Sequence, residues 1–150
     1  MNIKEYSHPD QLERYSFLWS EARLVIAAVA LLIGGRPVLL AILPVPMFFG
    51  LVRLVLTLSW LISGAVSGYL LYRWVTGNKV LFGKKDQPDL IAFLISVVSG
   101  INLGLTGLTG NNIGMSILGS KMIFIVTAIM YLAVAGYLFK RWNESGKKVF

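Results

Sequence analysis

Three polar residues in an otherwise apolar stretch are the first candidates for chemistry. Asn102 is the one side-chain amide well inside a long apolar run, and Ser99 and Thr106 lie about one helical turn before and after it. A buried amide without a hydrogen-bond partner costs about 2–7 kcal/mol, so Asn102 must face protein or water. The three residues could line a pathway for a solute. The alternative, which we favour, is an interhelical hydrogen bond from Asn102, worth on the order of 1 kcal/mol.

Arg36 is a fourth candidate, because it is a cation beside a break in a helix. It follows Gly34 and Gly35 and precedes Pro37, which lacks a backbone donor and ends or breaks a helix. In this position Arg36 could bind an anion or a lipid head group. The more ordinary interpretation is that its side chain reaches outward to water at the membrane surface.

The remaining ionisable residues argue against catalysis. A proton-coupled carrier usually keeps a carboxylate or a histidine within the membrane, so that class is disfavoured. His8 is the only histidine, cysteine is absent, and no base accompanies the intramembrane serines. We therefore expect no enzymatic activity, no cofactor and no metal site. All the acidic residues lie outside the apolar runs or at their ends: Glu5, Asp10, Glu13, Glu21, Asp86, Asp89 and Glu144.

The composition is that of a membrane protein. Of the 150 residues, 56% are hydrophobic and 14% are charged, whereas about a quarter of the residues in a soluble domain are charged. Unbroken apolar runs indicate spanning helices, since barrel strands alternate apolar and polar residues. Lys and Arg, which give the net charge of +7, gather at the ends of these runs, where anionic head groups lie. The expected partner is therefore the lipid bilayer and not nucleic acid.

The apolar runs predict an all-α integral membrane four-helix bundle. The first run is short and needs residues 17–23 to complete a span, which places Arg23 where it can reach water at the inner interface. The four predicted spans cover about 17–35, 51–74, 90–108 and 122–139. Between and after them we expect an irregular apolar connection at 36–50 that either re-enters the membrane or packs on the bundle, a basic loop at 77–89, a tight Gly/Asn-rich turn at 109–121 and a basic tail at 140–150.

The N-terminal segment 1–20 is polar and mixed in charge. Ser7 is a suitable N-cap, with Asp10 three residues on. The following residues place apolar side chains on one helical face, which predicts a short amphipathic helix at the membrane interface. The alternative is a polar segment that simply continues into the first span.

Charge distribution sets the predicted orientation. Four spans place the N-terminus, the 77–89 loop and the C-terminus on one side. That side holds every Lys and Arg except Arg36, Arg53 and Lys121. The positive-inside rule then predicts a multi-pass protein of the cell membrane with both termini in the cytoplasm.

One stretch of the chain occurs twice. Residues 65–74 realign without a gap on residues 133–142, and only three positions differ. We interpret residues 21–76 and 90–139 as two tandem helical hairpins, a parallel internal repeat of the kind found in some transporters. The alternative is convergence, because apolar helices share a small alphabet.

Two further sets of residues are expected to serve the bundle. Small residues at helical spacing allow close packing of helices in lipid, and aromatic and basic residues at helix ends mark a membrane interface. The expected packing residues are Ser63, Gly64, Ser67, Gly68, Gly100, Gly104, Gly107, Ala135 and Gly136. The expected interface residues are Tyr69, Tyr72, Arg73, Trp74, Tyr137, Lys140, Arg141 and Trp142.

Two functions fit these observations. The first is a non-catalytic membrane protein that assembles through its small-residue faces, either as a homo-oligomer or as an accessory subunit of a membrane complex. The second is a channel or facilitator for a small neutral or anionic solute, with Asn102, Ser99, Thr106 or Arg36 as its contacts.

Overall fold

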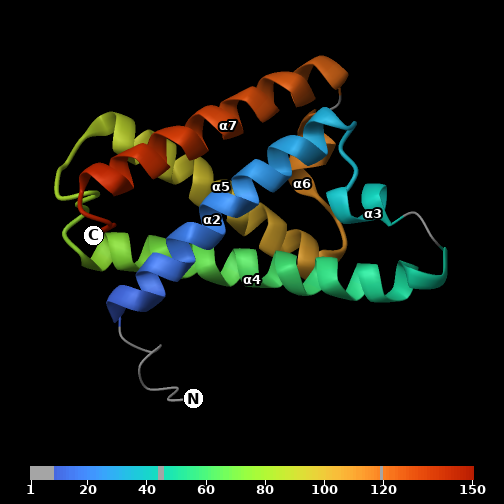
Figure 1. Ribbon diagram of the computed structural model, residues 1–150, viewed down its shortest axis with the longest axis horizontal. Helices are drawn as coiled ribbons and strands as arrows, with labels where there is room; N and C mark the ends of the chain where they lie inside the picture. The colour runs from blue at the N-terminus through green and yellow to red at the C-terminus, as the bar shows by residue number, and fades with distance from the viewer. Residues whose placement is uncertain (1–8, 44–45, 119) are drawn as a thin grey trace.

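The computed structural model describes residues 9–43, 46–118 and 120–150, and the regular elements within them are helices (Figure 1). Four helices are long and apolar enough to cross a membrane, which confirms the predicted all-α membrane four-helix bundle. The chain is thus a multi-pass membrane protein. The four helices are α2 (Pro9–Leu32), α4 (Phe49–Thr76), α5 (Gln87–Thr109) and α7 (Lys121–Glu144).

The first span begins earlier than the apolar run alone suggested. Helix α2 continues without a break from Asp10, in its first turn, to Leu32. No glycine or proline interrupts residues 10–32, and an acidic residue in a first turn favours helix formation there. Residues 10–20 are therefore the first turns of the span, and no separate interfacial helix forms within them. Ser7, the expected cap, and the rest of residues 1–8 lie outside the described residues.

Short helices occupy the connection between α2 and α4 and the connection between α5 and α7. The apolar connection 36–50 contains α3 (Val38–Ile42) and η1 (Pro46–Phe48), because its prolines prevent one continuous helix. The predicted tight turn at 109–121 instead contains α6 (Ile113–Leu118). Helix α5 ends before α6 at Gly110, which adopts the left-handed conformation with φ 75°.

The closest helix pairs are α4 with α5 and α2 with α7. Figure 1 shows α4 (green) and α7 (red) on opposite sides, with α2 and α5 between them. The two helices within each predicted hairpin pack less extensively than these cross-hairpin pairs. The pairs are nevertheless related by exchanging α2 with α5 and α4 with α7. This exchange turns the α4–α5 pair into the α7–α2 pair, and the α2–α4 pair into the α5–α7 pair.

Small residues bring the backbones of α4 and α5 together. A Cβ atom added to Gly64 would lie 2.6 Å from the Cα of Gly104, and the reverse holds equally. One Cβ at Gly107 would lie 3.1 Å from the side chain of Leu61, and one at Gly100 would collide with Ser67. These predicted packing residues therefore act within one chain, where close approach replaces the hydrophobic gain that lipid does not offer.

Aromatic residues fill the end of the bundle that holds the 77–89 loop and the C-terminal tail. The first aromatic cluster joins Phe17 to Phe82 and Trp142, with ring centroids 6.0 and 5.5 Å apart. The second aromatic cluster joins Phe93 to Trp74 and Phe150, both at 6.0 Å. The backbone N–H of Phe82 donates to the carbonyl of Val149 at 2.8 Å, so the loop and the tail pack together.

Gly104→Ala should destabilise the bundle, because the new methyl group forces α4 and α5 apart. We expect a loss of about 1–3 kcal/mol in the free energy of unfolding, measured as a lower midpoint of thermal unfolding in mild detergent. Gly68→Ala is the matched control, since a Cβ there meets no atom within 4 Å and the gain in helix propensity is the same. Equal midpoints for the two variants would contradict the close approach.

Candidate functional site

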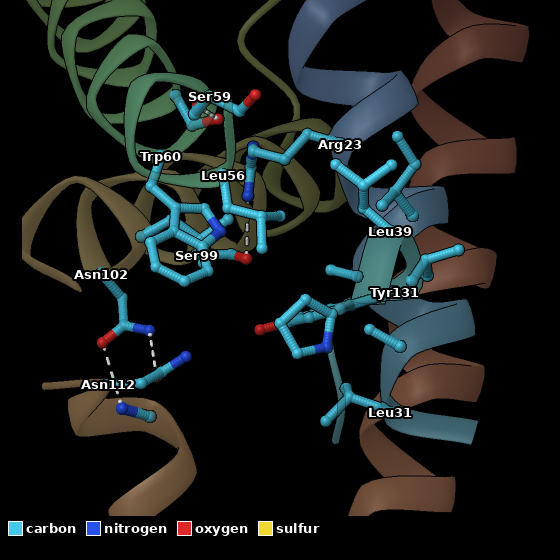
Figure 2. Close-up of a pocket in the computed structure, with 18 of the residues that line it drawn as sticks. Arg23, Leu31, Leu39, Leu56, Ser59, Trp60, Ser99, Asn102, Asn112 and Tyr131 are labelled. Atoms are coloured by element: carbon cyan, nitrogen blue, oxygen red, sulfur yellow. Dashed lines mark hydrogen bonds between the residues drawn. The ribbon is translucent and has the colours of Figure 1, made fainter. Parts of the chain in front are cut away.

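A cavity of about 330 Å³ lies between α2 and α4 and is bordered by α3, α5, α6 and one residue of α7 (Figure 2). This volume is within the range of small-molecule binding sites. Its walls are mainly apolar. The apolar lining comprises Trp19, Ala22, Ile26, Ala27, Ala30, Leu31, Gly35, Pro37, Val38, Leu39, Val55, Leu56, Trp60, Leu103, Gly114 and Met115, and the polar lining comprises Arg23, Ser59, Ser63, Ser99, Asn102, Asn112 and Tyr131.

Arg23 is the charged side chain of this cavity. It is 6% exposed, and its guanidinium donates to the Ser99 hydroxyl at 2.9 Å and to the Ser96 carbonyl at 2.7 Å. Its Nε is buried and has no hydrogen-bond partner among the described residues. Within the described part of the chain, none of the ion pairs includes Arg23. The guanidinium is therefore held by neutral oxygens, with its charge uncompensated by a directly bonded carboxylate.

The expectation that Arg23 reaches water at the inner interface is wrong. Because α2 starts at Pro9, Arg23 lies deep within the helix, and α5 presents two serines one turn apart to its side chain. The sequence contains a signal for this placement. Four of the buried polar residues of α2 fall on one helical face at i, i+3 and i+4 spacing: Glu13, Ser16, Ser20 and Arg23.

Asn102 makes hydrogen bonds that hold α6 against α5. Its Nδ2 donates to Oδ1 of Asn112 at 2.9 Å, and its Oδ1 accepts from the backbone N–H of Gly114 at 3.0 Å (Figure 2). The favoured hydrogen-bond interpretation thus describes its contacts, although its partners lie in the α5–α7 connection. Asn102 also lines the cavity, as the pathway interpretation expected.

The other candidate residues divide between the cavity and the rest of the bundle. Ser99 lines the cavity and accepts from Arg23. Thr106 is buried outside it, and its hydroxyl donates to the Asn102 carbonyl at 2.8 Å. Arg36 is exposed and is not among the lining residues. Anion binding by Arg36 therefore stays a prediction, separate from the cavity.

Glu21 is a buried carboxylate that the sequence analysis placed at the end of a span. It is 6% exposed in the middle of α2, and neither of its oxygens has a hydrogen-bond partner among the described residues. It occupies the helical face that also carries the buried Phe17, Leu24 and Ala28, whereas Arg23 faces α5. Glu21 is thus a carboxylate buried within a spanning helix. The sequence-based reason for disfavouring a proton-coupled carrier, that such a residue is lacking, therefore no longer holds.

Two ion pairs link the long helices near the aromatic clusters. Asp89 is fully buried and accepts from Nε and Nη2 of Arg141, both at 2.7 Å, and from the Tyr137 hydroxyl at 2.7 Å. Glu13 of α2 forms the corresponding ion pair with Arg73 of α4. The buried carboxylates of Glu13 and Asp89 are therefore bound by residues of a neighbouring helix that were predicted for the membrane interface: Arg73, Tyr137 and Arg141.

The remaining interface residues differ in exposure. Tyr72 and Lys140 are exposed, Tyr69 and Trp74 are half-buried, and Trp142 is buried in the first aromatic cluster. The repeated stretch does not reveal the ion pairs, because the carboxylates of Glu13 and Asp89 lie outside it. Glu13 lies four residues before Phe17, as Asp89 lies four residues before Phe93, and this common spacing could have revealed them.

Comparisons with known protein families, curated proteins and solved structures find no match for this chain. Within residues 9–43, 46–118 and 120–150, no group of three His, Cys, Asp or Glu side chains could hold a metal ion.

Asp89→Asn should lower stability, because it leaves the Arg141 guanidinium without its buried carboxylate. We expect the midpoint of thermal unfolding to fall by about 5 °C or more. The control is Lys140→Gln, which removes an exposed partner 3.8 Å from Glu144 and should change the midpoint by about 1 °C or less. A similar small effect in both variants would show that the buried pair does not stabilise the bundle.

Proposed function

We propose that this membrane protein is non-catalytic and that its cavity binds a small solute with an anionic or hydrogen-bond-accepting group. The observation that carries the proposal is Arg23, a buried cation at an apolar cavity with no carboxylate bonded to it. A charge removed from water is costly unless it is paired. An anion in the cavity that contacts the Arg23 side chain would supply the missing pair.

The surroundings of Arg23 suit a bound solute. Ser99 holds the guanidinium in place, and the amides of Asn102 and Asn112 are fixed by their own hydrogen bonds. The solute therefore meets groups whose positions are already set, which lowers the entropic cost of binding. Figure 2 shows the Arg23 side chain reaching toward Ser99, and Asn102 bonded to Asn112 in another part of the cavity wall.

A facilitator requires a binding step of this kind, and facilitation of a small solute is part of the proposal. The aromatic clusters and the ion pairs fill the bundle at the end that holds the chain's basic loop and tail. Passage to that side therefore requires the helices to move, which favours a facilitator over an open channel.

Arg23→Gln should weaken binding of benzoate, a small carboxylate probe, at least tenfold, because a hydrogen bond to a charged group contributes about 1.5–3 kcal/mol. Fluorescence of Trp19 and Trp60, which line the cavity, reports binding to the protein in phosphatidylcholine nanodiscs. Arg36→Gln is the matched control, since Arg36 is an exposed arginine outside the cavity. Equal losses in the two variants, or no saturable binding by the unaltered protein, would refute the proposal.

Assembly with a second copy or with a partner subunit is a second candidate function. Most of the small residues of α4 and α5 are used within one chain, but Gly68 of α4 and Gly136 of α7 are exposed, and a Cβ at either meets no atom within 4 Å. These two glycines leave room for another helix to approach closely.

The combined substitution Gly68→Leu and Gly136→Leu should convert a defined oligomer to a single chain, measured by mass in mild detergent after subtraction of bound lipid. Val126→Leu, at a 61% exposed position of α7, is the control and should leave the mass unchanged. A single-chain mass for the unaltered protein would exclude self-assembly and leave the role of accessory subunit.

The internal repeat, the orientation and the location belong to the same proposal. The repeat is supported by the matched aromatic clusters and ion pairs, which the exchange of α2 with α5 and of α4 with α7 relates to each other. Cytoplasmic termini in the cell membrane, with anionic head groups around the basic loop and tail, are supported by the distribution of Lys and Arg.

A further inference from the structure

The cavity opens sideways, toward lipid. Residues on both of its borders line the cavity and are exposed at the same time: Trp19 and Ile26 of α2 are 38% and 58% exposed, and Val55 of α4 is 42% exposed. All three lie within helices that can cross the membrane. A ligand that enters between α2 and α4 would therefore pass along exposed faces of two spanning helices.

The charge of the cavity matches one negative charge. Among the described residues, Arg23 is the one charged side chain in the lining, and none of the ion pairs includes it. A carboxylate carries one charge and fits the planar guanidinium. A phosphate with two charges would leave one of them unpaired among apolar walls, which is unfavourable.

The remaining walls suit an apolar chain. Beyond Arg23 and its polar neighbours, the lining is formed by aliphatic and indole side chains, Leu31, Leu39 and Leu56 among them. At about 30 Å³ per molecule in the liquid, 330 Å³ equals the volume of roughly eleven waters. The cavity thus holds a carboxylate and the first part of a chain, and the rest of a longer chain can extend through the side opening.

From this geometry we infer that the solute is an amphipathic monocarboxylate that enters from the bilayer between α2 and α4, with its carboxylate on Arg23 and its chain along the apolar walls. This inference rests on the proposed binding function and names its ligand class. A protein with such a ligand and route of entry differs from one that binds a small anion directly from water.

The test uses 12-bromododecanoate, whose bromine quenches tryptophan fluorescence, with the full chain in phosphatidylcholine nanodiscs. We expect saturable quenching above that caused by partition into lipid, and at least tenfold weaker binding to the Arg23→Gln variant. Dodecanoate should displace the probe at least tenfold more effectively than dodecanol or acetate. Dodecyl phosphate should compete less well than dodecanoate, and tighter binding of the phosphate would overturn the assignment of a carboxylate.

A substitution at the side opening tests the route. Val55→Trp should weaken or slow binding of 12-bromododecanoate at least fivefold, because the larger side chain narrows the gap between α2 and α4. Ile129→Trp is the control, because Ile129 is 60% exposed on α7 and lies outside the lining. Equal effects of Val55→Trp and Ile129→Trp on the bromo acid would overturn the lateral route.

The outcomes separate this inference from the function on which it rests. Binding of benzoate that depends on Arg23, without stronger binding of dodecanoate, would refute the amphipathic ligand and keep the binding function. Saturable binding of neither acid would refute both. Binding of dodecanoate that is indifferent to Arg23→Gln would show that the chain binds at another lipid-facing site and would also overturn the inference.

Discussion

A polar group inside a bilayer must find its partners within the protein, and the bundle is organised by this constraint. The Asp89–Arg141 and Glu13–Arg73 ion pairs each join neighbouring long helices, and Asn102 attaches the connection that contains α6. Arg23 follows the same rule only in part, because serine and backbone oxygens satisfy some of its donors while its charge has no bonded carboxylate. The cavity lies beside Arg23, which is outside the ion pairs of the described residues.

The packing of α4 differs between its two neighbours, and this difference creates the cavity. Toward α5 it presents Gly64, and the two backbones nearly touch. Toward α2 the indoles of Trp19 and Trp60 lie between the helices, and the Trp19 ring nitrogen donates to the Ser63 hydroxyl at 3.1 Å. Large side chains hold backbones apart, and the alanines that α2 contributes to the lining leave the space between the rings unfilled.

Much of the fold could be predicted from the sequence, because long apolar runs and lipid together leave few alternatives. The spans, the broken apolar connection and the close contact at Gly64 and Gly104 follow from apolar length, proline and small-residue spacing. The site was harder to predict. The apolar run predicts a first span from residue 17 and hence an interfacial Arg23, whereas the observed helix begins at Pro9 and Arg23 is buried within it.

The pairing of distant charged residues also lay beyond single-sequence reasoning. Arg73 and Arg141 stand at helix ends, where a basic residue usually meets head groups, and nothing in their own stretches shows that a carboxylate faces them. That information lies in the register between helices, which depends on how all four pack. Asn102 was predictable because an amide in an apolar run must have a partner, yet the identity of that partner depended on the shape of the α5–α7 connection.

The length of α4 gives the bundle a dependence on the membrane itself. Its 28 residues rise about 42 Å, whereas the hydrocarbon core of a bilayer is about 30 Å thick. This mismatch requires α4 to tilt or to extend into the head groups, by an amount that changes with bilayer thickness. The glycine contact ties α4 to α5, and the Glu13–Arg73 ion pair ties α4 to α2 near the basic loop, so a change in tilt alters the gap between α2 and α4 farther along these helices. Bilayer thickness is thus a physical variable that acts on the width of the cavity's opening.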